Sequence, residues 1–137
     1  MIIKDVKIIT IDNRGRIVIP LVTRKSLGLT TNTQLMLVSD SETKEIKITP
    51  VGISEEEKPI KFRITMEDIP GALAKIATTF GDMGISLIYG ESAIVEKDKI
   101  AIWTVISPTP TGITLEELRE KLIENGEALN VEVLPLD

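Results

Sequence analysis

Cysteine and histidine are both absent from the 137-residue chain. Their absence excludes disulfides, thiolate or imidazole metal sites, and nucleophiles activated by histidine. Aromatic residues make up only 3% of the sequence, too few for a surface on which single-stranded bases stack. The chain also lacks an apolar run of about 20 residues that could cross a bilayer, and its first residues lack the pattern of a signal peptide. We therefore expect a cytoplasmic protein that is not an enzyme, needs no metal or cofactor and does not enter a membrane.

Charge is distributed unevenly along the chain, although the formal net charge is only -5. Residues 1–52 carry 8 Lys or Arg against 5 Asp or Glu, a balance of +3, whereas residues 53–137 carry 8 against 16, a balance of -8. Between the halves, residues 53–59 combine glutamates with a proline, which is typical of a linker. We predict domains at residues 1–52 and 60–137. A domain of about 50 residues buries too little surface to be stable alone, so the first is expected to need a partner chain.

The N-terminal half predicts the order strand, strand, short helix, strand, strand. β-branched residues dominate the first two strands, and the turn between them, from Asp12 to Gly15, contains the Asn and Gly that favour a positive φ. The helix is expected to bury Leu21 and Leu27 and to end at Gly28. The predicted ranges are 8–11, 17–19, 35–38 and 46–48 for the strands and 21–27 for the helix.

An Asp-x-x-Gly-Arg turn at residues 12–16, an Ile-Pro strand end at residues 19–20 and an Arg-bearing helix follow one another in this half. In these features it resembles the AbrB/SpoVT-like swapped-hairpin DNA-binding domain of prokaryotic transcriptional regulators, and an archaeal source is expected. The resemblance implies an α+β protein whose N-terminal domain is a swapped-hairpin β-barrel dimer that binds double-stranded DNA.

Basic side chains carry the DNA-binding expectation. Arg16, Arg24 and Lys25 stand where the resembled family has basic residues, and Arg14 is an additional cation. Family members often have further basic residues where this chain has Ile9 and Thr10, so phosphate contacts are expected to shift toward the N-terminus. The alternative is that these cations are ordinary solvated residues. The expected DNA-binding residues are Arg14, Arg16, Arg24, Lys25, Lys4 and Lys7.

The C-terminal half predicts the order β-α-β-β-α-β, which is the ferredoxin-like arrangement. Asp68 and Pro70 are expected to begin the first helix, and Thr114 with Glu117 to begin the second through a capping box. The expected strands are 60–66, 85–95, 100–106 and 131–134, and the expected helices run from Pro70 to Phe80, with Gly81 and Gly84 at the exit, and from Thr114 to Gly126.

Asp68-Ile69-Pro70-Gly71 at the first strand-helix junction and Gly84-Ile85-Ser86 at the second strand make residues 60–136 similar to the ACT domain. The resemblance implies a ligand, often an amino acid, bound between two copies. Asp68 would hold the ammonium group, and an apolar pocket that includes Met66 would favour an apolar side chain. Met66 and Ser86 depart from ligand-binding members that carry His or Asn there. The expected ligand-binding residues are Asp68, Ile69, Pro70, Gly71, Ala72, Leu73, Ser86, Leu87 and Ile88.

The two resemblances together predict a transcriptional regulator that senses an amino acid. It is expected to form a homodimer, and a tetramer if the ACT-like domains also pair. Three alternatives remain open. The second domain could be a pairing module without a ligand. The chain could be a regulatory or assembly subunit of an amino-acid biosynthetic enzyme. An antidote of a toxin pair would instead have a disordered tail, whereas residues 60–136 have the pattern of a folded domain.

Overall fold

The computed structural model describes residues 4–53 and 57–136. The chain divides into two compact units, Met1–Glu55 and Glu56–Asp137, which we call unit 1 and unit 2. The division falls within the expected linker at 53–59, of which residues 54–56 lie outside the described part. Over the described ranges, the helices are too short or too polar to span a bilayer.

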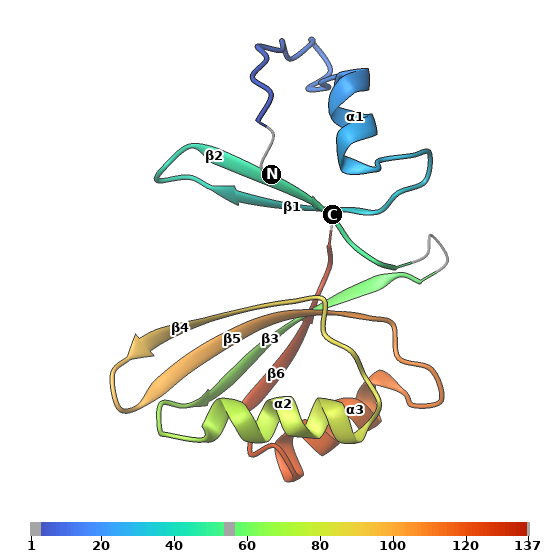
Figure 1. Ribbon diagram of the computed structural model, residues 1–137. Coiled ribbons are helices and arrows are strands. Elements are labelled where there is room, and N and C mark those ends of the chain that lie inside the picture. Colours follow the sequence, from blue (N-terminus) through green and yellow to red (C-terminus); the bar gives the residue numbers. More distant parts are fainter. Residues whose placement is uncertain (1–3, 54–56, 137) are drawn as a thin grey trace. The chain divides into compact units, whose positions relative to one another are not determined.

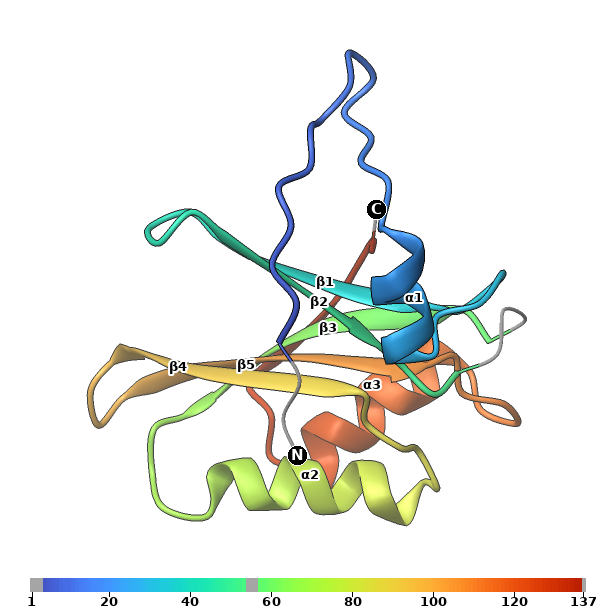
Figure 2. The same cartoon turned by 45° about the horizontal axis from the view of Figure 1, so that its top comes forward.

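Unit 1 begins with two arms that meet at a turn (Figure 2). Residues 8–11 and 17–19, which the sequence predicts as strands, are not strands in the structure. The turn is closed by hydrogen bonds from the Asp12 N–H to the Arg16 carbonyl at 2.9 Å and from the Gly15 N–H to the Asp12 carbonyl at 3.1 Å. The strand prediction is wrong for the single chain because a β-rich sequence also needs a neighbouring strand for its N–H and C=O groups.

Helix α1, Leu21–Leu27, forms as predicted and ends at Gly28, whose φ of 69° is left-handed. The N–H groups of Gly28 and Leu29 donate to carbonyls of the last helical turn. However, Leu21 and Leu27 are 54% and 56% exposed, so the expected burial of this face does not occur within one chain.

Strands β1, Leu35–Asp40, and β2, Glu45–Pro50, form an antiparallel hairpin. The pairing places Leu37 opposite Ile48 and Ser39 opposite Ile46, so alternate residues share one apolar face. Leu37 is 59% and Ile46 64% exposed. This two-stranded sheet is not closed, and the expected swapped-hairpin barrel is not shown by the single chain.

Unit 2 contains a four-stranded antiparallel sheet with the strand order β4-β5-β3-β6 and two helices on one face (Figure 1). Its order, β-α-β-β-α-β, agrees with the prediction and is compatible with a ferredoxin-like fold. The elements are β3 Pro59–Glu67, α2 Ala72–Asp82, β4 Tyr89–Glu96, β5 Ile100–Pro108, α3 Leu115–Glu124 and β6 Asn130–Leu134.

The core of unit 2 lies between the helices and the inner face of β3, β5 and β6. Phe80 of α2 links its aromatic residues, with ring centroids 5.9 Å from Phe62 and 6.1 Å from Trp103. Alternate residues of β5 are buried, as expected for a strand covered on one face. Strand β4 is different because it is an edge strand whose residues after Tyr89 are all exposed.

Several boundaries in unit 2 differ from the sequence predictions. The second strand begins at Tyr89, so residues 85–88 precede it. Helix α2 is preceded by Gly71, with a φ of 86° and no side-chain cap, rather than being capped by Asp68. Gly81 lies inside this helix instead of ending it. The capping box of α3 is confirmed, since the Glu117 N–H donates to Thr114 Oγ1 at 3.1 Å.

Candidate functional site

The turn of unit 1 is organised around the carboxylate of Asp12. Its Oδ1 accepts the N–H groups of Arg14 and Arg16, both at 2.9 Å, and its Oδ2 accepts Arg16 Nε at 2.8 Å. Gly15, with a φ of 74°, supplies the left-handed residue that this tight loop requires. The sequence predicted the turn and its glycine, but it did not indicate that Asp12 would bind Arg16.

The six cations expected to bind DNA differ in the contacts that they form. Besides Arg16, Lys7 is paired with a carboxylate, since its Nζ lies 3.5 Å from Asp5 Oδ2. Arg24 Nε donates to the backbone carbonyl of Ile19 at 3.0 Å, which orients the guanidinium without neutralising it. The cations that form no ion pair with a described residue are Arg24, Arg14, Lys25 and Lys4. Acidic neighbours therefore offset part of the positive charge of unit 1.

We expect the pKa of Asp12 to lie below its ordinary value of 3.8, chiefly because the carboxylate accepts the backbone N–H of Arg16. A lowered folded-state pKa means that the carboxylate stabilises the turn above pH 3.8, and that this contribution is lost as the pH falls through the folded-state pKa. A carboxyl-detected NMR titration measures the value directly. In Arg16→Ala the pKa should rise only part of the way, because both backbone donors remain. A wild-type pKa at or above the ordinary value would contradict the geometry of the turn.

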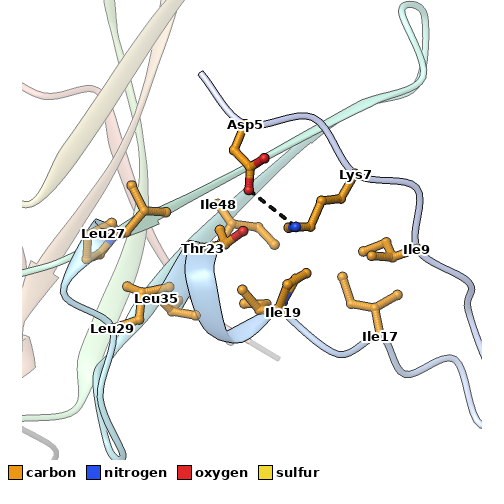
Figure 3. A pocket seen from close by; sticks show the side chains of 12 residues that line it. Asp5, Lys7, Ile9, Ile17, Ile19, Thr23, Leu27, Leu29, Leu35 and Ile48 are labelled. Atoms are coloured by element: carbon orange, nitrogen blue, oxygen red, sulfur yellow. Dashed lines mark ion pairs between the residues drawn. The ribbon is translucent and has the colours of Figure 1, made fainter. Parts of the chain in front are cut away.

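An open apolar cavity of about 290 Å³ lies within unit 1. Figure 3 shows that side chains from both arms, α1 and the hairpin point toward one another around it, with the Asp5–Lys7 ion pair beside them. No described residue of unit 1 is buried, although many of its side chains are aliphatic. The cavity therefore has the composition of a hydrophobic core without the burial that would make it stable. Its lining includes Ile9, Ile17, Ile19, Leu27, Leu29, Leu35 and Ile48.

In unit 2 a groove of about 480 Å³ lies between the start of α2 and strand β4. The buried side chains of Met66 and Ala101 form its floor, and Ile94, which is 62% exposed, stands on its β4 side. It is mostly apolar, and its size is within the range of small-molecule sites. The residues that line it are Met66, Glu67, Asp68, Ile69, Ala72, Leu73, Ser92, Ala93, Ile94 and Ala101.

The groove brings together four of the nine expected ligand-binding residues. These are Asp68, Ile69, Ala72 and Leu73. Pro70 and Gly71 belong to the β3–α2 loop but do not line the groove. Ser86, Leu87 and Ile88 do not line it either, because they lie before β4, and Leu87 packs against the core.

The residues on β4 were missed, although the sequence holds a signal for them. A turn was expected at residues 96–99, and a hairpin with this turn pairs Ile94 with Ala101 and Ser92 with Trp103. All four then face the helices. Counting backward from the turn would therefore have placed Ser92 and Ile94 at the groove.

A second cavity of about 350 Å³ lies on another side of the β3–α2 loop. Ile69 and Ala72 line both cavities, and Ile123 of α3 lines only this one. An ion pair between Lys75 Nζ and Glu127 Oε2, at 2.8 Å, ties α2 to the loop after α3. No group of three or more metal-ligating His, Cys, Asp or Glu side chains occurs among residues 4–53 and 57–136.

Comparison with protein families identifies part of unit 2. Residues 62–124 match the family model of the ACT domain, and the match runs from Phe62 within β3 to the last residue of α3. No curated protein matches the chain. The match does not reach unit 1, and the resemblance of that unit to swapped-hairpin domains stays a prediction. An ACT domain is therefore found at residues 62–124, and it implies regulation by a small molecule, often an amino acid.

Proposed function

We propose that this protein is a DNA-binding transcriptional regulator whose ACT domain senses an apolar amino acid. The observation that carries the proposal is the groove beside α2, which lies inside the matched ACT domain and has an apolar floor. The protein acts in the cytoplasm and has no catalytic activity of its own. An apolar side chain of the ligand lies over Met66 and Ala101, where it removes apolar surface from water.

Unit 1 supplies the DNA contacts in this proposal. Asp12 fixes the turn, so that Arg14 and Arg16 are displayed from a defined loop rather than from a freely moving arm. Arg24 and Lys25 follow on α1. Basic side chains held in this way contact phosphates more readily than base edges, so affinity for duplex DNA exceeds selectivity among sequences.

A second copy of the chain completes unit 1. The arms expected as strands lack strand neighbours in the described chain, and the apolar face of the hairpin is largely exposed. Pairing of two copies gives the arms backbone partners and covers the aliphatic side chains, which lowers the free energy of both. ACT domains commonly oligomerise, so pairing through unit 2 as well produces a tetramer.

A duplex-binding assay repeated with and without each amino acid tests the proposal. An effector that regulates DNA binding should change the duplex affinity by a factor of about 5 to 150, and DNA should change the effector affinity by the same factor. If the protein binds no duplex under any of these conditions, the proposal that it binds DNA is rejected. A duplex affinity that does not change with any amino acid would mean that the protein binds DNA constitutively.

The double variant Arg16→Ala and Arg24→Ala should weaken duplex binding and flatten its salt dependence by about one unit for each lost phosphate contact. The matched control is Lys97→Ala with Lys121→Ala, which removes the same charge from unit 2. Affinity measured between low and physiological salt distinguishes the pairs. Equal losses in the two double variants would mean that only net charge matters, which would reject the assigned site.

A second candidate function is a regulatory or assembly subunit of a biosynthetic enzyme, with unit 1 used only for oligomerisation. The pairing of Arg16 with Asp12 and of Lys7 with Asp5 favours it, because both pairs reduce the charge available to phosphates. This candidate predicts no duplex binding even at low salt. An amino acid at 100 times its dissociation constant should still stabilise the folded protein by about 2.7 kcal/mol.

A further inference from the structure

The carboxylate of Asp68 joins two segments that lie 30 residues apart in the sequence. Its Oδ2 accepts the N–H of Asp98 at 2.7 Å, and the Asp68 N–H donates to the carbonyl of Lys99 at 3.1 Å. In the first bond the side chain of Asp68 is the acceptor, and in the second its backbone N–H is the donor. Together they hold the β3–α2 loop against the turn between β4 and β5.

The turn that Asp68 holds has an unusual backbone. Asp98 has a φ of 64°, a left-handed value that is uncommon for residues other than glycine, although Asp and Asn adopt it more often than most, and the Lys99 N–H closes the turn on the Glu96 carbonyl at 3.0 Å. The β4–β5 ladder is also irregular between Ile94 and Glu96. The carboxylate of Asp68 adds a contact from outside the turn, at the N–H of the residue with the positive φ.

The same two segments form the opposite sides of the groove. Ile69, Ala72 and Leu73 follow Asp68 on one side, and Ser92, Ala93 and Ile94 precede the turn on the other side. Strand β4 is an edge strand, so in the described chain its only ladder is with β5. The distance between the two sides therefore depends on how the end of the β4–β5 hairpin is held.

We propose that Asp68 is a positioning residue that sets the width of the groove, and that it does not hold the ammonium group of the ligand. The proposal rests on the proposed function of the ACT domain as an amino-acid site. It replaces the role that the family resemblance implies for Asp68. The N–H of Asp98 requires an oxygen acceptor but not a negative charge, whereas an ammonium group requires the charge.

Two substitutions separate these roles. Asp68→Asn keeps an oxygen that can accept the Asp98 N–H and removes the charge, whereas Asp68→Ala removes both. With L-leucine as the probe, Asp68→Ala should lower the affinity about tenfold, the value of one lost hydrogen bond near the upper end of its usual range. Asp68→Asn should stay within about threefold of the wild type, because a neutral acceptor forms a weaker bond than a charged one. If both variants lose the same affinity, the charge itself is required and the proposal fails.

A ligand pair gives an independent test of the charge. 4-Methylpentanoate has the carboxylate and the side chain of leucine but no ammonium group. The ratio of leucine affinity to 4-methylpentanoate affinity should be the same in the wild type and in Asp68→Asn. A ratio that falls tenfold in Asp68→Asn would show that the carboxylate binds the ammonium group.

Hydrogen exchange in the full chain without ligand tests the positioning role separately from leucine binding. The amide of Asp98 should exchange about tenfold faster in Asp68→Ala than in the wild type, with the core amides of β3 and β5 unchanged. Asp98→Gly is the control, since it keeps the N–H and suits the positive φ, and its amide at position 98 should stay protected. Unchanged exchange in Asp68→Ala would overturn the proposal, whereas a failure of leucine to bind the wild type would count against the proposed function alone.

Discussion

Gly126→Ala should lower the free energy of unfolding of unit 2 by about 1 to 3 kcal/mol, the range expected when an added methyl group overpacks a close contact. A Cβ at this position would lie 2.7 Å from the carbonyl oxygen of Leu122, 3.2 Å from Thr79 Oγ1 and 3.4 Å from the Cα of Ile76. The Leu122 oxygen also accepts the Ala128 N–H at 3.0 Å, so it cannot move away without weakening that bond. The added methyl group therefore displaces the loop that follows α3 from the end of that helix and also presses on Thr79 of α2.

Gly81→Ala is the matched control for this substitution. Gly81 lies inside α2, and a Cβ there would meet nothing within 4 Å. Alanine should stabilise the helix by about 0.5 kcal/mol, because it loses less conformational freedom than glycine on folding. The two variants add the same methyl group and should change stability in opposite directions.

Urea unfolding followed by tryptophan fluorescence measures both variants, because Trp103 is the only Trp and is 7% exposed in the core of unit 2. Equal stabilities for Gly126→Ala and the wild type would show that the loop after α3 relaxes freely. The close approach at Gly126 would then not determine how α2 and α3 pack.

Much of unit 2 could be predicted from the sequence, because its signals are local and agree with one another. Alternating apolar residues predicted β3, and the Thr114–Glu117 capping box predicted the start of α3. Residues 85–88 were misassigned because β-branched residues also pack in loops, and nothing local marks Tyr89 as the first residue to pair with β5.

Only one side of the groove could be predicted from the sequence, and the reason is different. Asp68, Ile69, Ala72 and Leu73 are close together in the sequence, so a motif could identify them. The opposite side depends on the pairing of Ile94 with Ala101, which is a contact of β4 with β5. The role of Asp68 required the position of the Asp98 N–H, and that comes from the folded hairpin.

In unit 1 the expected strands and the expected burial do not form within a single chain. Residues 8–11 and 17–19 have strand propensity, but in the described chain they have no strand partner, and their side chains are exposed except for the half-buried Ile19. Leu27 lines the apolar cavity of unit 1 but Leu21 does not, and both remain more than half exposed in the described chain. A sequence pattern indicates that a residue tends to pair in a sheet or to be buried. A single chain shows only the pairing and the burial that it forms by itself.

Leu37→Glu should dissociate the pair of unit 1 domains that we propose. Leu37 is 59% exposed in the single chain, so a charged side chain there costs little in a monomer. In the proposed dimer the same side chain is buried among aliphatic residues, and an unpaired buried carboxylate costs several kcal/mol. The substitution therefore acts on association and hardly at all on the isolated chain.

Two measurements test whether Leu37→Glu dissociates the pair. The mass in solution should fall to half, to a monomer if unit 1 alone pairs and to a dimer if the ACT domains pair as well. The amides of residues 8–11 should be protected from hydrogen exchange in the wild type and lose that protection in Leu37→Glu, since only a second copy offers these arms a strand partner. Trp103 fluorescence should not change, because unit 2 keeps its core.

Val38→Glu places the same charge on the opposite face of the hairpin, beside Lys47 of β2. It should leave the mass and the exchange of the arms unchanged, because the cavity of unit 1 is lined from the other face of the hairpin, by Leu35 and Ile48. If both variants dissociate, the hairpin simply does not tolerate a carboxylate. If neither does, and residues 8–11 exchange rapidly in the wild type, the arms remain unpaired in solution. Unit 1 would then not be a dimerisation domain, and the defined display of Arg16 and Arg24 to DNA would lose its scaffold.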